Sequence, residues 1–329
     1  MNKIDELKEL AKLNKKRIIL PEGNDNRILA SASIIVEEDI ANLILIGKKE
    51  EIISKYPNLS KVEWINPDDS NLIDKYGTKL YELRKDKGLT KEEAIKLLKT
   101  NYMYLACMLV LDKKADGIVG GISYSSSDTL RPALQLIKGK ESLVSSFFLM
   151  ETHNKELGEN GLFIFADCGL NQDPNSSELA MIAKQSINSF NELIGTTPKV
   201  AFLSHSTYGS SNHEMIDKVK EATRIAKNNN PNYLIDGELQ VDAAIIPEVA
   251  KIKCPNSPLS GKANILIFPD LDSGNIAYKL VERFGASRAY GPLTQGLNYP
   301  VNDLSRGSSV EDIVGVITIT SIQATKNVL

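Results

Sequence analysis

A short stretch near the end of the chain, PVNDLSRGSSVEDIVG at residues 300–315, gathers side chains that can do chemistry. Ser305 offers a hydroxyl, Arg306 a planar guanidinium that matches phosphate oxygens, and Asp312 a carboxylate. A hydroxyl and a guanidinium on a glycine-containing turn suit a phosphorylated ligand, and a carboxylate nearby can accept or orient a proton. The stretch therefore predicts an anion-binding site.

The same stretch also has the spacing of a helix start. Ser308 and Glu311 match a capping box, in which each side chain accepts a hydrogen bond from a free backbone N–H. The apolar residues that follow recur at helical spacing, at Val310, Ile313, Val314 and Ile317. This pattern predicts a helix, although the β-branched run IVGVITITSI is by itself typical of a strand. Capping explains neither Arg306 nor Asp312, so both interpretations stay open.

A second polar loop follows a glycine-rich strand in GIVGGISYSSSDTLRPALQ, residues 117–135. Free N–H groups at a helix start bind anions, and the fork of Arg131 suits phosphate. A plain turn between strand and helix, with Asp128 as the N-cap, explains the same residues. Neither GxGxxG nor GxxxxGK[ST] occurs, so the dinucleotide and P-loop fingerprints are absent from the sequence.

Several other candidate residues have plainer explanations. Arg84 and Arg283 fall near helix ends, where arginines are ordinarily solvated. Cys168 has no histidine near it in sequence to act as its base, and a small buried residue is the simpler reading. His205 and His213 lack the spacing of a metal site and instead suit a polar loop and a helix start. No carboxylate cluster for magnesium is readable, so no metal is expected.

Composition excludes several classes of protein. The 329 residues carry a net charge of -3, which gives no basic field for nucleic acid or anionic lipid. Three separated cysteines without CxxC spacing are typical of reduced thiols in the cytoplasm. No apolar run approaches the roughly 20 residues of a membrane span. The N-terminal segment reads as an amphipathic helix rather than a targeting peptide, with apolar residues at Ile4, Leu7, Leu10 and Leu13. We expect a soluble, cytoplasmic protein.

The elements that must position these residues alternate along the chain as in an α/β protein with a largely parallel sheet. The expected strands are residues 17–21, 41–47, 62–65, 116–121, 143–149, 162–167, 199–204 and 264–270. The expected helices are residues 70–87, 90–99, 176–193 and 212–228. Two of them begin with capping boxes, Thr90 with Glu93 and Asn175 with Glu178. The length predicts two domains, with a boundary near residues 140–160.

Seven stretches together resemble the phosphate acetyltransferase (phosphotransacetylase) family. In chain order they are RIILPEGNDNR, ELRKDKGLT, TLRPALQ, FADCGLNQDPN, PDLDSGN, AYGPLTQGL and PVNDLSRGSSVEDIV. They run from residue 17 almost to the end of the chain. Seven motifs in the right order make this resemblance specific.

The resemblance implies an enzyme of acetate metabolism that converts acetyl phosphate and coenzyme A to acetyl-CoA and phosphate. The thiolate attacks directly in a ternary complex, without an acyl-enzyme; coenzyme A is a substrate and no cofactor is bound. The implied fold has two α/β domains with mixed, largely parallel sheets flanked by helices, similar to isocitrate and isopropylmalate dehydrogenases. Residues 1–145 plus 302–329 would form the first domain and 146–301 the second, with the site in the cleft between them and a homodimer formed through the second.

The resemblance also assigns roles to individual residues. Ser305, Arg306 and Asp312 match the catalytic serine, arginine and aspartate of the family's last motif. The residues matched to acyl phosphate or phosphate binding are Arg84 and Arg131, and Arg283 is matched to a phosphate of coenzyme A. Many members carry cysteine where this chain has Ser308, so a cysteine at that position is not essential here.

Three questions remain open at the level of sequence. A carboxyl group of ordinary pKa, about 3.9, is a weak base for a thiol of pKa about 8.5, so Asp312 is either a base with altered surroundings or a group that orients the thiol. The acyl chain is another question, because a phosphate butyryltransferase shares the fold. The third is whether the chain is instead a non-catalytic sensor of coenzyme A or acyl phosphate. A metal-dependent decarboxylating dehydrogenase would need a carboxylate cluster and a nicotinamide site, and neither pattern is seen.

Overall fold

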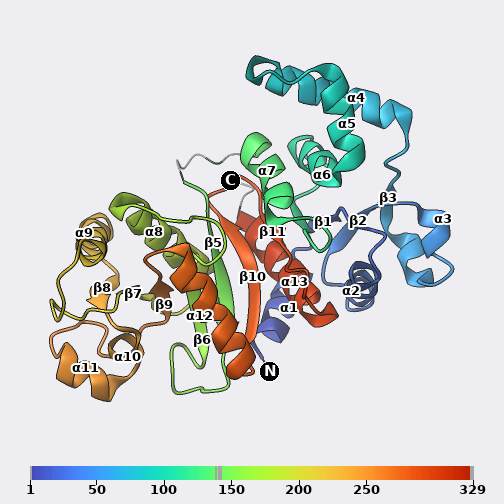
Figure 1. The fold of residues 1–329 in the computed structure, drawn as a ribbon. Coiled ribbons are helices and arrows are strands. Elements are labelled where there is room, and N and C mark those ends of the chain that lie inside the picture. The colour runs from blue at the N-terminus through green and yellow to red at the C-terminus, as the bar shows by residue number, and fades with distance from the viewer. Residues whose placement is uncertain (1, 138, 140–142, 327–329) are drawn as a thin grey trace. The chain divides into compact units, whose positions relative to one another are not determined.

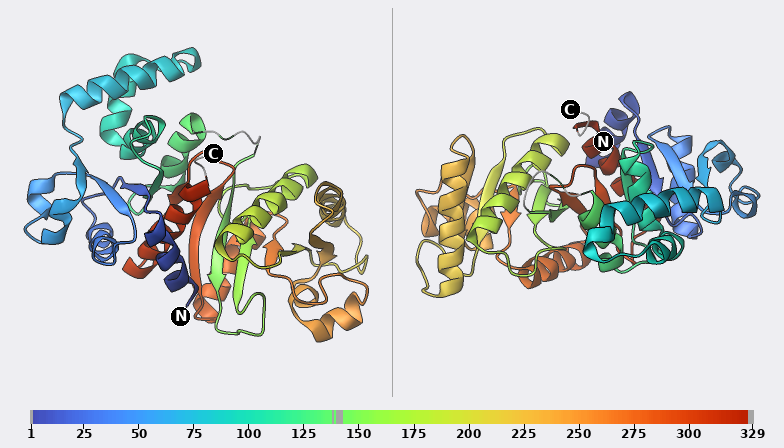
Figure 2. Two further views of the ribbon diagram at one scale, coloured as in Figure 1. Left: turned by 180° about the vertical axis from the view of Figure 1, so that it is seen from behind. Right: turned by 90° about the horizontal axis from the view of Figure 1, so that it is seen from above.

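The computed structural model describes residues 2–137, 139 and 143–326, which form two α/β units (Figure 1). The first unit takes in residues 1–142 and 297–329, and the second takes in residues 143–296. Both boundaries fall a few residues before those expected from the sequence. Figure 2 shows from two further directions that each unit has its own sheet among its own helices.

The first unit is built on a five-stranded sheet in the order β11-β4-β1-β2-β3, and all its pairs are parallel. Its strands are β1 Arg17–Leu20, β2 Asn42–Ile46, β3 Glu63–Ile65, β4 Gly117–Gly120 and β11 Val301–Asp303. Isoleucine, leucine and valine dominate β1, β2 and β4, as expected of strands buried on both faces. The short β11 pairs Asp303 with Gly120.

Helices surround this sheet. They are α1 Lys3–Leu13, α2 Asn26–Glu37, α3 Lys49–Ile52, α4 Ser70–Arg84, α5 Lys91–Thr100, α6 Tyr102–Leu111, α7 Ser126–Leu136 and α13 Val310–Lys326. Short 3₁₀ turns lie at Pro57–Lys61 and Lys85–Lys87. The apolar α6 is almost wholly buried, and α13 packs on α1, α2 and β4. The core of the unit lies between the sheet and these helices.

The second unit holds a six-stranded sheet in the order β10-β5-β6-β9-β7-β8. Its strands are β5 Ser145–Glu151, β6 Leu162–Ala166, β7 Lys199–Leu203, β8 Leu234–Leu239, β9 Ile265–Ile267 and β10 Arg288–Gln295. β5 is antiparallel to both β6 and β10, and the other pairs are parallel. The helices are α8 Ser176–Leu193, α9 Glu214–Asn229, α10 Val241–Ile245, α11 Pro247–Lys253 and α12 Leu271–Phe284.

These elements confirm the predicted α/β class with mixed, largely parallel sheets. All eight expected strands and all four expected helices are present, and both predicted capping boxes form. Three strands were not predicted: β8, β10 and β11. The stripe predicted on the first helix is wrong at its second half, because Leu10 and Leu13 are 50% and 83% exposed while Ala11 is buried.

No single helix among the described residues is long and apolar enough to cross a membrane. The bent pair α5 and α6 reaches the necessary length and composition only when its two helices are taken together.

Candidate active site

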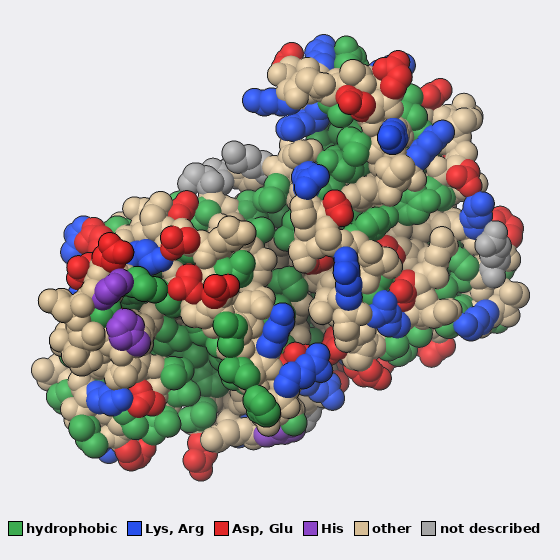
Figure 3. All heavy atoms as spheres, viewed as in Figure 1, with side chains coloured by type: hydrophobic (Ala, Val, Ile, Leu, Met, Phe, Trp, Pro, Cys, Tyr) green, Lys and Arg blue, Asp and Glu red, His purple; other side chains and the backbone are tan. Residues whose placement is uncertain are grey.

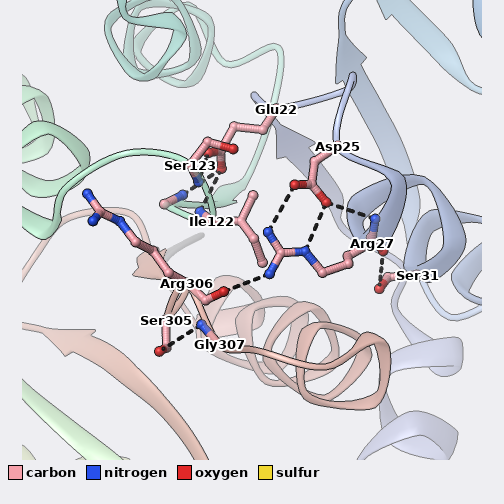
Figure 4. A network of polar contacts seen from close by, with 10 residues as sticks. Glu22, Asp25, Arg27, Ser31, Ile122, Ser123, Ser305, Arg306 and Gly307 are labelled. Atoms are coloured by element: carbon pink, nitrogen blue, oxygen red, sulfur yellow. Dashed lines mark hydrogen bonds and ion pairs between the residues drawn. The ribbon is translucent and has the colours of Figure 1, made fainter.

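Three neighbouring strands of the first unit end at one edge of its sheet. β11, β4 and β1 lie side by side and run parallel, so the loops that follow them meet there. Glu22 follows β1, residues 121–123 follow β4, and the Ser305–Arg306 turn follows β11. In α/β proteins, ligands bind beyond the carboxyl ends of the parallel strands, as at this edge. Figure 4 shows this region.

The Ser305–Arg306 turn joins β11 to α13 and leaves its catalytic candidates accessible. Ser305, Arg306 and Gly307 are all exposed. Within the turn the Gly307 N–H donates to Ser305 Oγ at 3.3 Å, and the Ser308 N–H donates to the Ser305 carbonyl at 2.9 Å. Both predicted residues therefore lie together on one short turn, with the Arg306 side chain extending away from α13 (Figure 4).

The capping box of α13 forms one residue later than predicted. The Asp312 N–H donates to Ser309 Oγ at 3.1 Å, and the Ser309 N–H donates to Asp312 Oδ2 at 2.9 Å. The predicted pair of Ser308 and Glu311 is wrong, because α13 begins at Val310 and so makes Ser309 its N-cap. Asp312 thus fixes the start of the helix that follows the Ser305–Arg306 turn.

The loop after β4 differs from the free anion site that its sequence suggested. Glu22, which is 8% exposed, accepts hydrogen bonds from the N–H groups of Gly121 and Ile122 at 2.7 and 3.0 Å and of Ser123 at 2.6 Å. A carboxylate of the chain itself therefore occupies this group of donors. The N-cap of α7 is Ser125 rather than Asp128: its Oγ accepts from the Asp128 N–H at 3.1 Å and donates to the Asp128 carboxylate.

Asp303 is a buried acid just before the Ser305–Arg306 turn. Its side chain lies against the start of α7, and its Oδ1 is buried without a hydrogen-bond partner. Burial raises its pKa to about 6, and the nearby charge of Glu22 adds to this, while the hydroxyls of Ser126 and Thr129 and the Leu304 N–H oppose it. A Cβ at Gly121 would collide with Asp303 Oδ1, so glycine is needed at that position.

The positive charges of Arg84 and Arg131 both act on Tyr104 of α6. Arg84 is the last residue of α4 and is half-buried, and Arg131 lies on α7, where it donates to Ser127 Oγ at 2.8 Å. Burial raises the pKa of Tyr104, and the positive charges of Arg131 and Arg84 oppose that rise. Arg131, but not Arg84, lines a cavity of about 270 Å³. The other lining residues are Leu97, Thr100, Asn101, Tyr104, Tyr124, Asp128 and Pro132.

Arg283 belongs to the second unit. It lies in the last turn of α12 with a side chain 74% exposed, and its Nε is 3.6 Å from a carboxylate oxygen of Glu282. The residues from Asp272 to Asn275, in the motif PDLDSGN, lie in the first turns of α12, which Asp270 caps.

Asp167, Cys168 and His213 have structural roles. Asp167 is buried and accepts hydrogen bonds from backbone and side-chain donors, including the Gly169 and Leu170 N–H groups at 2.9 and 3.1 Å. Burial raises the pKa of the Cys168 thiol well above its usual range, which does not suit a nucleophile. His213 caps α9. Among the described residues no group of three or more His, Cys, Asp or Glu is placed to hold a metal.

The sequence alone did not predict a role for several residues described above. Glu22 and Arg27 belong to the motif RIILPEGNDNR. The motif indicates that they have a role but does not predict what they contact. Asp303 belongs to the motif PVNDLSRGSSVEDIV but was assigned no role there, and Tyr104 lies in none of the seven motifs. Their surroundings come from segments remote in the chain, so only the structure reveals them.

Comparison with known proteins agrees with the geometry. Residues 3–321 match the model of the phosphate acetyl/butaryl transferase family. The chain belongs to this family. A phosphate acetyltransferase of Thermoanaerobacterium thermosaccharolyticum is 52% identical over 98% of this chain and 100% of its own. Another, of Acetivibrio thermocellus, is 49% identical over 98% of both chains. The family makes this protein an acyltransferase.

Solved structures give the same result for the fold. A phosphotransacetylase of Streptococcus pyogenes matches with a TM-score of 0.89 and 43% identity over 98% of both chains. A 4-hydroxythreonine-4-phosphate dehydrogenase of Klebsiella pneumoniae matches with a TM-score of 0.53 and 11% identity, over 94% of this chain and 100% of its own. The second match concerns the fold alone, and it bears out the predicted likeness to dehydrogenases.

Proposed function

We propose that the Ser305–Arg306 turn is where this phosphate acetyltransferase transfers acetyl between phosphate and coenzyme A. The observation that carries the proposal is the meeting of three parallel strand ends, which presents an exposed serine and arginine on a turn at the ligand-binding edge of the sheet. The name of the two relatives, phosphate acetyltransferase, supports acetyl and phosphate as the groups exchanged, and membership of the family supports coenzyme A as the acetyl acceptor.

In the proposed reaction the thiolate of coenzyme A attacks the acetyl carbon directly, and the bond from that carbon to the phosphate oxygen breaks. Negative charge builds on the carbonyl oxygen and then on the departing phosphate. The Ser305 hydroxyl and the Arg306 guanidinium stabilise that charge as preorganised donors. Arg84 and Arg131, whose charges both act on Tyr104, hold the phosphate group of acetyl phosphate. Arg283 contacts a phosphate of coenzyme A.

For Asp312 we propose an orienting role. Its Oδ2 accepts the Ser309 N–H at 2.9 Å, so one oxygen of the carboxylate is engaged in the cap of α13. The thiol of coenzyme A can lose its proton to solvent rather than to Asp312, at a pH where a useful fraction of the thiol is ionised. The Asp312 carboxylate fixes the point at which the turn continues into α13, and its other oxygen contacts the thiol of coenzyme A.

The test is a kinetic assay of thioester formation by ultraviolet absorbance, with acetyl phosphate and coenzyme A in the presence of EDTA. We expect activity in EDTA, and a loss of kcat on the order of 10²-fold or more in Arg306→Ala with an unchanged thermal transition. Arg131→Gln should raise KM for acetyl phosphate. Full kcat in Arg306→Ala contradicts the catalytic role, and a rise in KM for coenzyme A alone contradicts the phosphate role of Arg131.

The same assay separates the competing functions. Absence of any thioester would favour a sensor of coenzyme A or acyl phosphate. A higher kcat/KM for butyryl phosphate than for acetyl phosphate would favour the butyryl-transferring branch of the family.

We also propose that the protein is a cytoplasmic homodimer formed through the second unit. The support is an apolar face on α12, where Ile276, Leu280 and Phe284 follow one another at helical spacing and are 57%, 48% and 88% exposed. Hydrophobic side chains line the surface along this helix in Figure 3. A second copy of the chain would cover them.

A further inference from the structure

We propose that Arg27 is a positioning residue for acetyl transfer, which holds the Ser305–Arg306 turn through the backbone carbonyl of Arg306. The inference rests on the proposed function of that turn. Arg27 and Arg306 are 279 residues apart in the sequence and meet at the edge of one sheet.

The guanidinium of Arg27 is fixed by two partners. Its Nε and Nη2 donate to the two oxygens of Asp25, at 3.2 and 3.0 Å, and this fork–fork pair sets the plane of the group. Its Nη1 then donates to the Arg306 carbonyl at 2.7 Å (Figure 4). Asp25 is itself held, because it caps α2 by accepting the Arg27 N–H at 2.8 Å. The turn is therefore tied to the first turn of α2.

Ser31 provides a second tie one helical turn further along α2. Its hydroxyl is fully buried and lies 2.8 Å from the Arg27 carbonyl and 3.1 Å from the Val310 carbonyl. Arg27 thus contacts the start of the segment from Arg306 to Val310, and Ser31 contacts its end. Both ties come from the same face of one helix.

This arrangement matters because the turn itself is exposed and lies outside regular structure. Donors that stabilise a transition state must be placed closely, and a misplacement of about 1 Å can lower the rate on the order of 10²-fold. Lysine has one ammonium group and cannot form the Asp25 pair and the carbonyl bond in the same geometry. Position 27 therefore requires the planar guanidinium of arginine, which can make all three bonds at once.

A direct role is the competing explanation. Arg27 is 37% exposed and could contact a substrate phosphate instead of acting through Arg306. The two roles predict different kinetics. A phosphate contact raises KM for one substrate, whereas a displaced turn lowers kcat with KM for both substrates nearly unchanged.

The experiment compares Arg27→Gln and Arg27→Lys with the matched control Arg17→Gln. Arg17 pairs with both oxygens of Asp116 and donates to the Lys113 carbonyl, so it makes the same three kinds of bond at the opposite, amino end of β1. We expect kcat to fall about 10- to 100-fold in both Arg27 variants, with KM changed less than about threefold. Arg17→Gln should keep the wild-type kcat while losing a similar amount of thermal stability.

Three results would overturn the inference. They are wild-type kcat in Arg27→Lys, a rise in KM without a fall in kcat, and an equal fall of kcat in the control. If Arg27→Gln does not fold, the lysine variant, which keeps the charge, answers the same question.

A double-mutant cycle separates this inference from the proposed function beneath it. If Arg27 acts through Arg306, the variant that combines Arg27→Gln with Arg306→Gln should be no slower than Arg306→Gln alone. Multiplied effects of the two changes would overturn positioning and leave the role of Arg306 intact. Full activity in Arg306→Gln would instead overturn the proposed function of the turn, and positioning with it.

Discussion

Asp303 shows how the chemistry of one residue bears on stability. Its carboxyl group lies at the end of β11 with one oxygen unpartnered, and the charge of Glu22 is nearby. Its folded pKa of about 6 lies above the ordinary value of 3.8, so the folded state binds the proton more tightly than the unfolded state. The stabilisation that the protonated Asp303 carboxyl gives the folded state is therefore fully present below pH 3.8 and is lost as the pH rises through 6.

We predict that Asp303→Asn is more stable than the wild type at pH 7.5, by up to about 3 kcal/mol, and that the two converge near pH 4. The amide keeps the shape of the side chain and removes the buried charge. Urea unfolding at several pH values measures the difference.

Asp116→Asn is the control, for which the expected change in stability at pH 7.5 has the opposite sign. The pKa of Asp116 is lowered: burial opposes this, but hydrogen bonds from Arg17 outweigh it. Its stabilisation is present above the unfolded pKa and is lost as the pH falls, so this variant should be less stable at pH 7.5. Equal stability of Asp303→Asn and wild type across the whole range would contradict the raised pKa.

At the scale of elements, the cap of α13 lies next to the turn for which we propose a catalytic role. Ser309 and Asp312 each accept a hydrogen bond from the other's backbone N–H, and only Gly307 and Ser308 separate Ser309 from Arg306. The capping box of α5, Thr90 with Glu93, has the same chemistry away from the turn. These two boxes allow the cost of a lost cap to be separated from its effect on catalysis.

We predict that Ser309→Ala and Thr90→Ala each lower stability by about 1 kcal/mol, because each leaves an N–H of the first helical turn unpaired. Only Ser309→Ala should also lower kcat, since it releases Asp312 and loosens the turn. Thermal unfolding and steady-state kinetics on both variants check this. An equal kcat in the two variants would show that the cap of α13 has no part in catalysis.

The elements that the sequence predicted are those with a strong local signal. Runs such as RIIL and NLILI indicate buried strands, and the boxes at Thr90 and Asn175 mark helix starts. The three missed strands lack that signal. β8 contains two acids and a glycine, β10 is interrupted by Gly291-Pro292, and β11 is the polar VND. Their burial comes from neighbouring strands rather than from their own composition.

The candidate site was predictable in its residues and not in its contacts. The stretch SSVED offers two overlapping pairs of serine and acid, and one residue of register decides whether Ser308 or Ser309 caps the helix. The bond from Arg27 to the Arg306 carbonyl and the use of Glu22 at residues 121–123 join remote segments. No local pattern encodes such contacts.

At the scale of the whole molecule, the apolar face of α12 gives the proposed homodimer a test. Leu280→Asp places a charge in the middle of this face, where it cannot be buried against a second copy. We predict a change from twice the chain mass to the single mass of 36.2 kDa in light scattering after gel filtration.

A surface control makes the result specific. Arg224→Gln on α9 removes a solvent-exposed pair with Glu221 and should leave the mass unchanged. A wild-type protein that is already monomeric would contradict the homodimer, and a dimeric Leu280→Asp would place the interface elsewhere.

The division of the first unit between the two ends of the sequence has a consequence for biosynthesis. Residues 143–296 are contiguous and can fold while translation continues. The first unit lacks β11 and α13 until residues 301–326 have left the ribosome. The turn with Ser305 and Arg306 is therefore synthesised after the whole of the second unit. A nascent chain can hold a finished second unit before the Ser305–Arg306 turn exists, so the second unit must be able to fold without it.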